Sequence, residues 1–256
     1  MKKILSDSQA AHFADKGFVL LANPLSKEVM ADVERRQREM APAWEERTFP
    51  EQLNRSACQF LLVGEVLLRK VERPDLVDMA RTLLGCDEVH IGACGLGDAS
   101  KVLAADGRGK RQVHWHADGG PEVAQVAMRT ALDPHGRDNG PLRVLPGSKK
   151  RSHEDMLEEF KQLELATGQH REEPELFFAR HPHEVEVHLD PHWTLVWNPS
   201  TWHATSEKVA PGPRRAMSWN YFPAGGRRRD SEAVKFIYDG QWQKWPRERQ
   251  RLWGLI

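Results

Sequence analysis

The sequence has little of what marks several large classes of protein. Its three cysteines, Cys58, Cys86 and Cys94, are odd in number and have no metal-binding spacing, so we expect reduced thiols and no disulfide framework. Lys and Arg number 37, as do Asp and Glu, and this balance argues against nucleic acid as a partner. No internal repeat or low-complexity linker is present, so we expect one domain over residues 1–256.

Long apolar runs are missing as well. No stretch approaches the ~18 apolar residues that a membrane-spanning helix needs, so we expect no membrane partner. The chain turns polar at Ser6, which is not the pattern of a signal peptide. Because 39% of the residues are hydrophobic and 29% are charged, a packed core is feasible. Together these features predict a cytoplasmic protein.

The first part of the chain, residues 1–89, has mostly helical patterns. Ser6 to Gln9 matches a capping box at the start of a short helix that ends at Gly17. A buried strand is expected directly afterwards, at Phe18–Leu21, and helical periodicity returns over residues 59–85. We therefore expect a helical N-terminal support.

From His90 onward the pattern changes to short strands separated by turn residues. They are expected at 123–132, 142–145, 185–189, 194–197 and 216–221. Many short strands at close spacing predict a β-sandwich or barrel over residues 90–222. A polar helical insertion is expected at 152–178, and residues 223–256 form a C-terminal extension.

The most informative segment contains His116 and Asp118. Side chains alternate along a strand, so these two residues would face the same side. The following Gly-Gly-Pro at 119–121 ends the strand beside a loop, where functional sites are common. Adding His203 gives two histidines and one carboxylate, the facial triad of non-heme Fe(II) oxygenases.

Further motifs follow in a fixed order. Trp115 precedes the His-x-Asp pair, an Asn-Gly-Pro-Leu segment begins at Asn139, and a Pro-Gly-Ser turn ends at Ser148. His203 comes next, and Arg214 lies eleven residues after it. In this combination and order, the chain resembles the phytanoyl-CoA dioxygenase (PhyH) family of Fe(II)- and 2-oxoglutarate-dependent oxygenases. The resemblance extends over about residues 7–222.

The resemblance implies a fold and a set of roles. The fold would be mainly β with helical additions: a double-stranded β-helix (a cupin-like jelly roll) with N-terminal helices. His116, Asp118 and His203 would bind Fe(II). Arg214 would hold the distal carboxylate of 2-oxoglutarate by a two-point salt bridge, helped by the Thr205 hydroxyl.

The resemblance also implies the reaction. With 2-oxoglutarate and O2 as co-substrates, the enzyme would oxidise a small organic molecule, most simply by hydroxylation, and release succinate and CO2. Specialised metabolism is the expected setting. A halogenase of this type carries Gly or Ala in place of the carboxylate, so Asp118 argues against that outcome. The substrate and the oligomeric state are left open.

Several alternatives remain at this point. If β-strand alternation is regular, His114 also faces the metal side, and a cupin-type metalloenzyme that does not use 2-oxoglutarate would take His114, His116 and the later Glu122 as ligands. A non-catalytic jelly-roll binding protein is the other alternative. A register slip by one residue would exchange the roles of Arg214 and Arg215.

Three smaller questions stay open as well. Trp115 is expected to point away from the metal, and tryptophans 197, 202 and 219 fit either a pocket wall or the core. Asn220 has no fixed register. The insertion at 152–178 fits a lid over the site or a decorative helix equally well.

Overall fold

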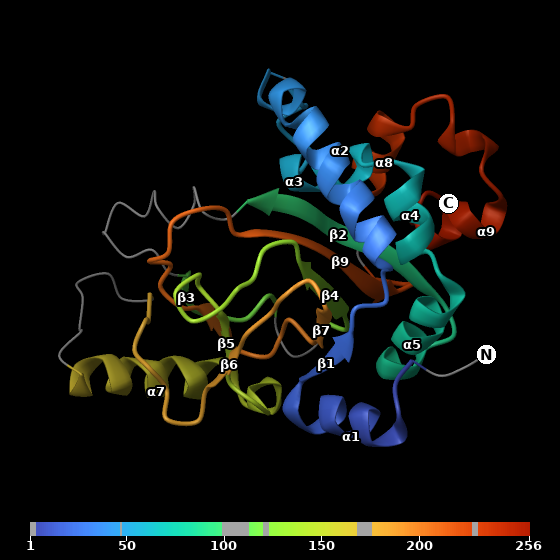
Figure 1. The fold of residues 1–256 in the computed structure, drawn as a ribbon. Helices are drawn as coiled ribbons and strands as arrows, with labels where there is room; N and C mark the ends of the chain where they lie inside the picture. The colour runs from blue at the N-terminus through green and yellow to red at the C-terminus, as the bar shows by residue number, and fades with distance from the viewer. Residues whose placement is uncertain (1–3, 47, 99–112, 120–122, 168–175, 227–229) are drawn as a thin grey trace.

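Two antiparallel β-sheets form the centre of the structure, a computed structural model that describes residues 4–46, 48–98, 113–119, 123–167, 176–226 and 230–256 (Figure 1). The five-stranded sheet has the order β1-β7-β4-β9-β2, and the four-stranded sheet the order β3-β8-β5-β6. The strands are β1 (Phe18–Ala22), β2 (Val89–Asp98), β3 (Val113–His116), β4 (Val126–Ala131), β5 (Leu142–Val144), β6 (Val185–Val187), β7 (Trp193–Trp197), β8 (His203–Thr205) and β9 (Arg215–Pro223). Their positions confirm the strands that the sequence predicts.

The two sheets pack face to face around a small apolar core. Ala127 and Leu195 from the five-stranded sheet meet Leu142 and Val144 from the four-stranded sheet in one buried cluster. Alternation along β4 explains the division, because Ala127 faces this interior whereas its neighbour Met128 faces the helices outside. This is the double-stranded β-helix that the sequence predicts.

Helices cover the outer face of the five-stranded sheet (Figure 1). They are α1 (Asp7–Lys16), α2 (Lys27–Glu46), α3 (Arg55–Leu62), α4 (Glu65–Val71) and α5 (Pro74–Leu84). The predicted capping box is present: the Ser6 hydroxyl accepts from the Gln9 backbone N–H, and the Gln9 side chain accepts from the Ser6 N–H. Gly17 ends α1 in the left-handed region, with φ 88°. The N-terminal helices of the predicted fold are therefore confirmed.

The C-terminal segment completes the same core. It forms α8 (Ser231–Ile237), a short 3-10 turn η2 (Trp242–Lys244) and α9 (Arg247–Leu252). Val234, Tyr238 and Trp253 join the buried cluster between the helices and the sheet. Sequence reasoning assigned no structure to this extension.

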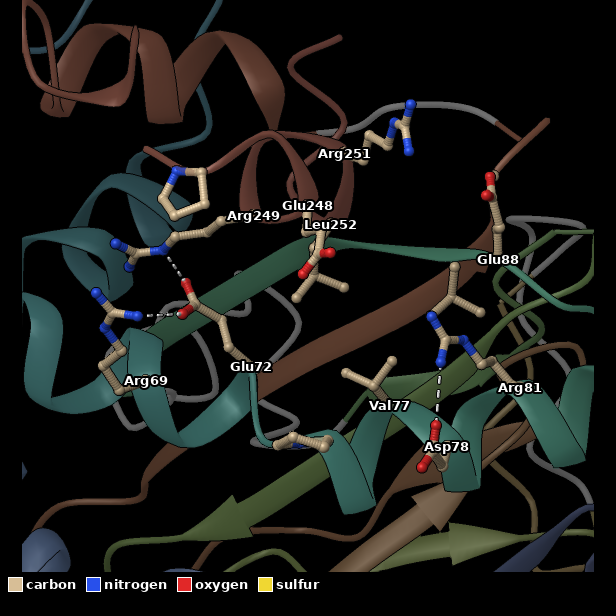
Figure 2. Close-up of a pocket in the computed structure, with 14 residues that line it drawn as sticks. Arg69, Glu72, Val77, Asp78, Arg81, Glu88, Glu248, Arg249, Arg251 and Leu252 are labelled. Atoms are coloured by element: carbon tan, nitrogen blue, oxygen red, sulfur yellow. Dashed lines mark hydrogen bonds and ion pairs between the residues drawn. The ribbon is translucent and has the colours of Figure 1, made fainter. Parts of the chain in front are cut away.

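A groove of about 520 Å³ lies where α9 approaches α4 and α5 (Figure 2). Figure 2 shows that its charged side chains are largely matched: Glu72 accepts from Arg249 and pairs with Arg69, and Arg81 pairs with Asp78. The groove is lined mainly by helical residues, with Glu88, Val89 and Ala224 beside them, and does not include the His-x-Asp segment.

Helix α7 (His153–Ala166) packs on the back of the four-stranded sheet (Figure 1). Its buried Phe160 stacks on Trp115 at 5.0 Å between ring centroids and also contacts Trp202. The lid hypothesis is not supported for residues 152–167, because α7 covers the outer side of the strands that carry His116 and His203. The rest of the insertion at 168–175 lies outside the described residues.

Loops from distant parts of the chain meet at the end of α1. The carbonyl of Lys16 accepts from Gly147 N, and the carbonyl of Gly17 accepts from Asn198 N. A Cβ at Gly17 would lie 2.2 Å from the Thr201 hydroxyl oxygen, so a glycine is needed there for space as well as for its positive φ. The Lys149-Lys150 pair also faces α1, because Lys150 pairs with Asp15. No helix in the described ranges combines the length and apolarity that crossing a bilayer requires.

Replacing Phe160 with Ala tests the packing of α7. The side chain is fully buried among aromatic rings, so we expect the free energy of unfolding to fall by about 3–5 kcal/mol. Urea denaturation measures this change. Leu165→Ala on the exposed side of the same helix is the control and should cost less than about 1 kcal/mol. Equal small losses in both variants would contradict the assignment.

Candidate metal centre

The pairing of β3 with β8 brings His116 opposite His203. Two Cα partners define this pairing, Val113 with Thr205 and His116 with His203, and the register shifts between them. Three steps along β3 therefore match two steps along β8, which is a β-bulge. Because of the bulge, Val113 and His116 both line the same cavity.

Both imidazoles are oriented by the backbone. The Nδ1 atom of His116 lies 2.9 Å from the carbonyl of His114, and Nδ1 of His203 lies 2.9 Å from the carbonyl of Thr201. A carbonyl only accepts, so Nδ1 carries the proton in each ring and donates it. The Nε2 atoms are then left as free lone pairs, which is the form in which histidine binds a metal.

The third residue, Asp118, is held at its backbone. Its N–H donates to the Pro199 carbonyl, and its own carbonyl accepts from the Gln125 side chain, which accepts in turn from Asn220. The carboxylate lies 3.8 Å from Nε2 of His116 and 3.8 Å from Nε2 of His203. The ligand atoms of all three residues are within 4.8 Å of one another.

The electrostatic environment keeps His203 neutral. Burial and the neighbouring His116 lower the pKa of His203 to about 4, against the opposing effect of the Asp118 carboxylate. At neutral pH its imidazole is therefore available as a lone-pair donor.

These observations fit a divalent metal ion. Two atoms that each lie roughly 2.1 Å from one ion are at most about 4.2 Å apart, and both histidine-to-carboxylate distances are shorter than this limit. Two neutral imidazoles and one carboxylate also match the donor set that suits non-heme Fe(II). Elsewhere in the described ranges, no other group of three or more such side chains gathers in this way.

The three residues lie in a cavity of about 400 Å³ between the two sheets. Its remaining walls come from both sheets: Ala93, Val113, Gln125, Arg129, Leu142, Trp197, Thr205, Arg214, Ser218 and Asn220. Ala93 has an uncommon positive φ of 50° where the β2–β9 register shifts, and such backbone conformations concentrate at functional sites.

Arg214 and Thr205 meet at the turn that contains Gly140. The guanidinium of Arg214 donates from Nε and Nη2 to the Gly140 carbonyl, at 2.9 and 2.6 Å. A Cβ at Gly140 would lie 3.1 Å from Arg214 Nε and 3.4 Å from a Thr205 methyl carbon. The Asn-Gly-Pro motif therefore fixes a corner of the cavity that holds one cation and one hydroxyl. Burial lowers the pKa of Arg214 to about 9, so it still carries its charge at neutral pH.

Arg215 occupies a different environment. Its backbone and guanidinium both donate to Asp133, and the side chain also reaches Glu34 outside the sheet. Arg214 lines the cavity and Arg215 does not. The register alternative raised by the sequence is thus wrong, and the arginine eleven residues after His203 is the one beside the candidate site.

Within the described residues, the structure does not support the cupin-type ligand set. The bulge leaves His114 outside the cavity lining, against Phe178 and the ring of His116. Regular alternation, the condition under which His114 would face the metal side, is not met, because the bulge breaks it. Glu122, the remaining member of that set, lies outside the described residues.

Of the four tryptophans considered above, one lines the cavity and the others pack in the core. Trp197 lines the cavity, whereas Trp115 and Trp202 pack under α7 and Trp219 packs against the helices. The prediction that Trp115 points away from the site is confirmed. Asn220 lines the cavity, which the sequence left undecided.

Sequence reasoning missed Gln125, Ser218 and Arg129 in the cavity wall. Arg129 is a single charged residue in a largely apolar strand, but which way it points is shown only by the pairing of that strand in the sheet.

Comparison with known proteins agrees with this fold. The family profile of phytanoyl-CoA dioxygenase (PhyH) matches residues 13–216. The chain belongs to this family.

An ectoine dioxygenase of Bordetella bronchiseptica is 28% identical over 161 residues, which cover 57% of this chain and 50% of that protein. The chain thus spans about half the length of the curated relatives it matches.

Solved structures share the fold. EctD from S. alaskensis, solved with 2-oxoglutarate and 5-hydroxyectoine, has a TM-score of 0.62 at 21% identity and covers 88% of this chain and 79% of its own. AviO1 from Streptomyces viridochromogenes Tue57 has a TM-score of 0.63 at 16% identity, covering 89% of this chain and 99% of its own.

Gly140→Ala should disturb the corner beside Arg214. The residue has φ 62°, and the new Cβ would crowd Arg214 Nε and the Ser206 carbonyl at 3.1 Å. We expect a loss of about 1–2 kcal/mol in the free energy of unfolding from the left-handed backbone alone. Gly136→Ala in the same connection is a matched control, because nothing lies within 4 Å of its Cβ. If both variants unfold at the same urea concentration, both the backbone strain and the crowding assigned to Gly140 are wrong.

His135, buried near both cavity arginines, should make the protein sensitive to acid. Burial, Arg214 and Arg129 lower its pKa to about 2, whereas the unfolded chain protonates this histidine near pH 6.5. Below that pH the unfolded state binds more protons, so stability falls as the pH falls toward 2.

The substitution His135→Gln should reduce the slope of unfolding free energy against pH. The expected reduction is up to about 1.4 kcal/mol per pH unit below pH 6. Urea unfolding from pH 4 to pH 8 measures the slope for both proteins. Parallel curves would show that His135 does not titrate in this way.

Proposed function

We propose that this protein is an Fe(II)- and 2-oxoglutarate-dependent dioxygenase that oxidises a small organic molecule, with release of succinate and CO2. One observation carries the proposal: His116, Asp118 and His203 share a cavity with the buried cation Arg214. We also propose that residues 1–256 act as one domain, because the N-terminal and C-terminal helices share one core.

His116, Asp118 and His203 would hold the iron. When bound, Fe(II) supplies the chemistry that activates O2 at the expense of the 2-oxo acid. The backbone carbonyls of His114 and Thr201 hold each imidazole in the tautomer that offers Nε2. Asp118 adds one negative charge, and its presence disfavours a halogenase, in which that place is vacated for a halide.

Arg214 and Thr205 would bind the distal carboxylate of 2-oxoglutarate. A guanidinium presents a planar pair of donors that matches a carboxylate, and the hydroxyl adds a third. Arg214 is 2% exposed and Thr205 is 7% exposed, so their interaction with a carboxylate would be strengthened by the scarcity of water.

The substrate would be a small molecule. A cavity of about 400 Å³ must hold the co-substrate and the reacting part of the substrate, and it is at the small end of ligand sites. Relatives and neighbours support a role in specialised metabolism, since their names include ectoine dioxygenase and an α-ketoglutarate-dependent epimerase from nogalamycin biosynthesis. Hydroxylation is the simplest outcome that the site supports.

Anaerobic titration tests the proposal. Fe(II) followed by 2-oxoglutarate should produce a metal-to-ligand charge-transfer band in the wild-type protein. His116→Ala should abolish the band, and Arg214→Met should weaken 2-oxoglutarate binding by about tenfold or more, because a buried charged hydrogen-bond partner is lost.

Arg215→Met is the matched control, since this neighbour faces Asp133 outside the cavity, and it should leave the band unchanged. A wild-type protein that is fully loaded with iron and shows no band would rule out the proposal. Metal-dependent turnover that ignores 2-oxoglutarate would favour the cupin-type alternative, and absence of binding to either would favour a non-catalytic jelly-roll protein.

A further inference from the structure

Arg129 places a charged group on the inner face of β4. Side chains of β4 alternate, so Arg129 projects inward between Ala127 and Ala131, which are both fully buried. Its side chain lines the same cavity as the metal-ligand candidates and Arg214. A guanidinium in the interior of a double-stranded β-helix is costly to bury and needs a compensating group.

The other enclosed arginines have that compensation. Arg143 pairs with Glu184, Arg249 pairs with Glu65 and Glu72, and Arg214 donates to the Gly140 carbonyl. In the groove of Figure 2, Arg69 pairs with Glu72 and Arg81 pairs with Asp78 in the same manner. Within the described ranges, Arg129 has no hydrogen-bond acceptor and no ion pair.

Strand register places Arg129 between the two ends of the cavity. On β9, Ala127 pairs with Asn220, Arg129 with Ser218 and Ala131 with Ala216. Asn220 belongs to the metal end, because it binds Gln125, which in turn binds Asp118. Arg214 precedes β9 at the opposite end. Arg129 is therefore one inward step, about 7 Å, from the metal end and lies on the way to Arg214.

The charges around Arg129 favour an anion in this part of the cavity, between the metal end and Arg214. Burial lowers the pKa of its guanidinium, and Asp118 is the carboxylate that opposes this effect. Since Asp118 is a candidate metal ligand, a bound ion would take up part of its charge. The positive charge of Arg129 also acts on Arg214 and His203, whose protonated forms it disfavours. A negatively charged ligand lying between these groups would relieve the repulsion.

We propose that Arg129 is a second arginine for the distal carboxylate of 2-oxoglutarate, binding it from the five-stranded sheet while Arg214 and Thr205 bind it from the Gly140 corner. This inference rests on the proposed function. A carboxylate has two oxygens with about four acceptor positions, so it can accept from both guanidinium groups and from the hydroxyl. Arg129 would thus be a co-substrate-binding residue, and the dianion would neutralise a cation that has no ion pair among the described residues.

The test compares two 2-oxo acids of equal chain length. 2-Oxoglutarate carries the distal carboxylate, whereas 2-oxovalerate has a methyl group in its place. Dissociation constants are measured anaerobically on the Fe(II)-loaded protein from the charge-transfer band, without any turnover. Arg129→Met should weaken 2-oxoglutarate binding by about tenfold or more and change 2-oxovalerate binding by less than about twofold. Arg129→Lys keeps the charge but loses the planar fork, so its affinity for 2-oxoglutarate should lie between those of the wild-type protein and Arg129→Met.

Three results would overturn the inference. Equal losses for both acids would place Arg129 at the metal-bound end of the co-substrate. If Arg129→Met leaves the affinity for both 2-oxo acids unchanged, Arg129 binds some other anion. A larger loss in Arg215→Met than in Arg129→Met would point to an indirect effect through the sheet.

Each variant is first checked for folding by circular dichroism and for iron loading, and Arg129→Gln serves if the Met variant does not fold. If the wild-type protein itself binds no 2-oxoglutarate, the proposed function fails, and that outcome is distinct from all three results above.

Discussion

The site depends on the irregular pairing of two short strands, β3 and β8. A β-bulge between Val113 and His116 gives β3 one residue more than its partner and ends the alternation that would have turned His114 toward the cavity. It leaves one histidine from each strand facing the other, at 4.3 Å between ring centroids. The core beneath α7 supports this arrangement from behind, because Trp115 and Trp202 hold the backs of the two strands. Metal binding would therefore depend on the side-chain packing beneath α7, which lies outside the cavity.

The cavity is polar at both ends for different reasons. At one end, burial favours neutral imidazoles and one carboxylate, which is a donor set for a cation. At the other end, backbone carbonyls hold the guanidinium of Arg214 in place, and this group favours an anion. Arg129 on the opposite wall extends the positive region toward the metal end. A ligand that carries a chelating group and a distal negative charge fits this polarity in only one orientation.

Much of this could be predicted from the sequence where the signal is local. Caps, turns and alternation gave the positions of α1, β4 and β7, and motif order gave the three clustered residues. The orientation of His114 could not be predicted, since a bulge is a property of two paired strands and a single strand carries no sign of it. Helix α7 packs on the apolar side of β3. The predicted outward orientation of Trp115 therefore already indicated on which side of β3 an apolar helix face would pack. Arg129 was overlooked because a lone charge within a strand usually faces solvent, and only the sheet pairing shows that its neighbours are buried.

Asp118 has a further consequence for the order in which an ion and the site meet. Its side chain is 53% exposed, whereas that of His203 is 8% exposed, so an incoming cation reaches the carboxylate first and the enclosed imidazole last. A carboxylate attracts many divalent ions, while imidazole distinguishes among them more strongly. Capture and selection of the metal would then be separate events, and a chelator would remove the ion through the same open side by which it entered.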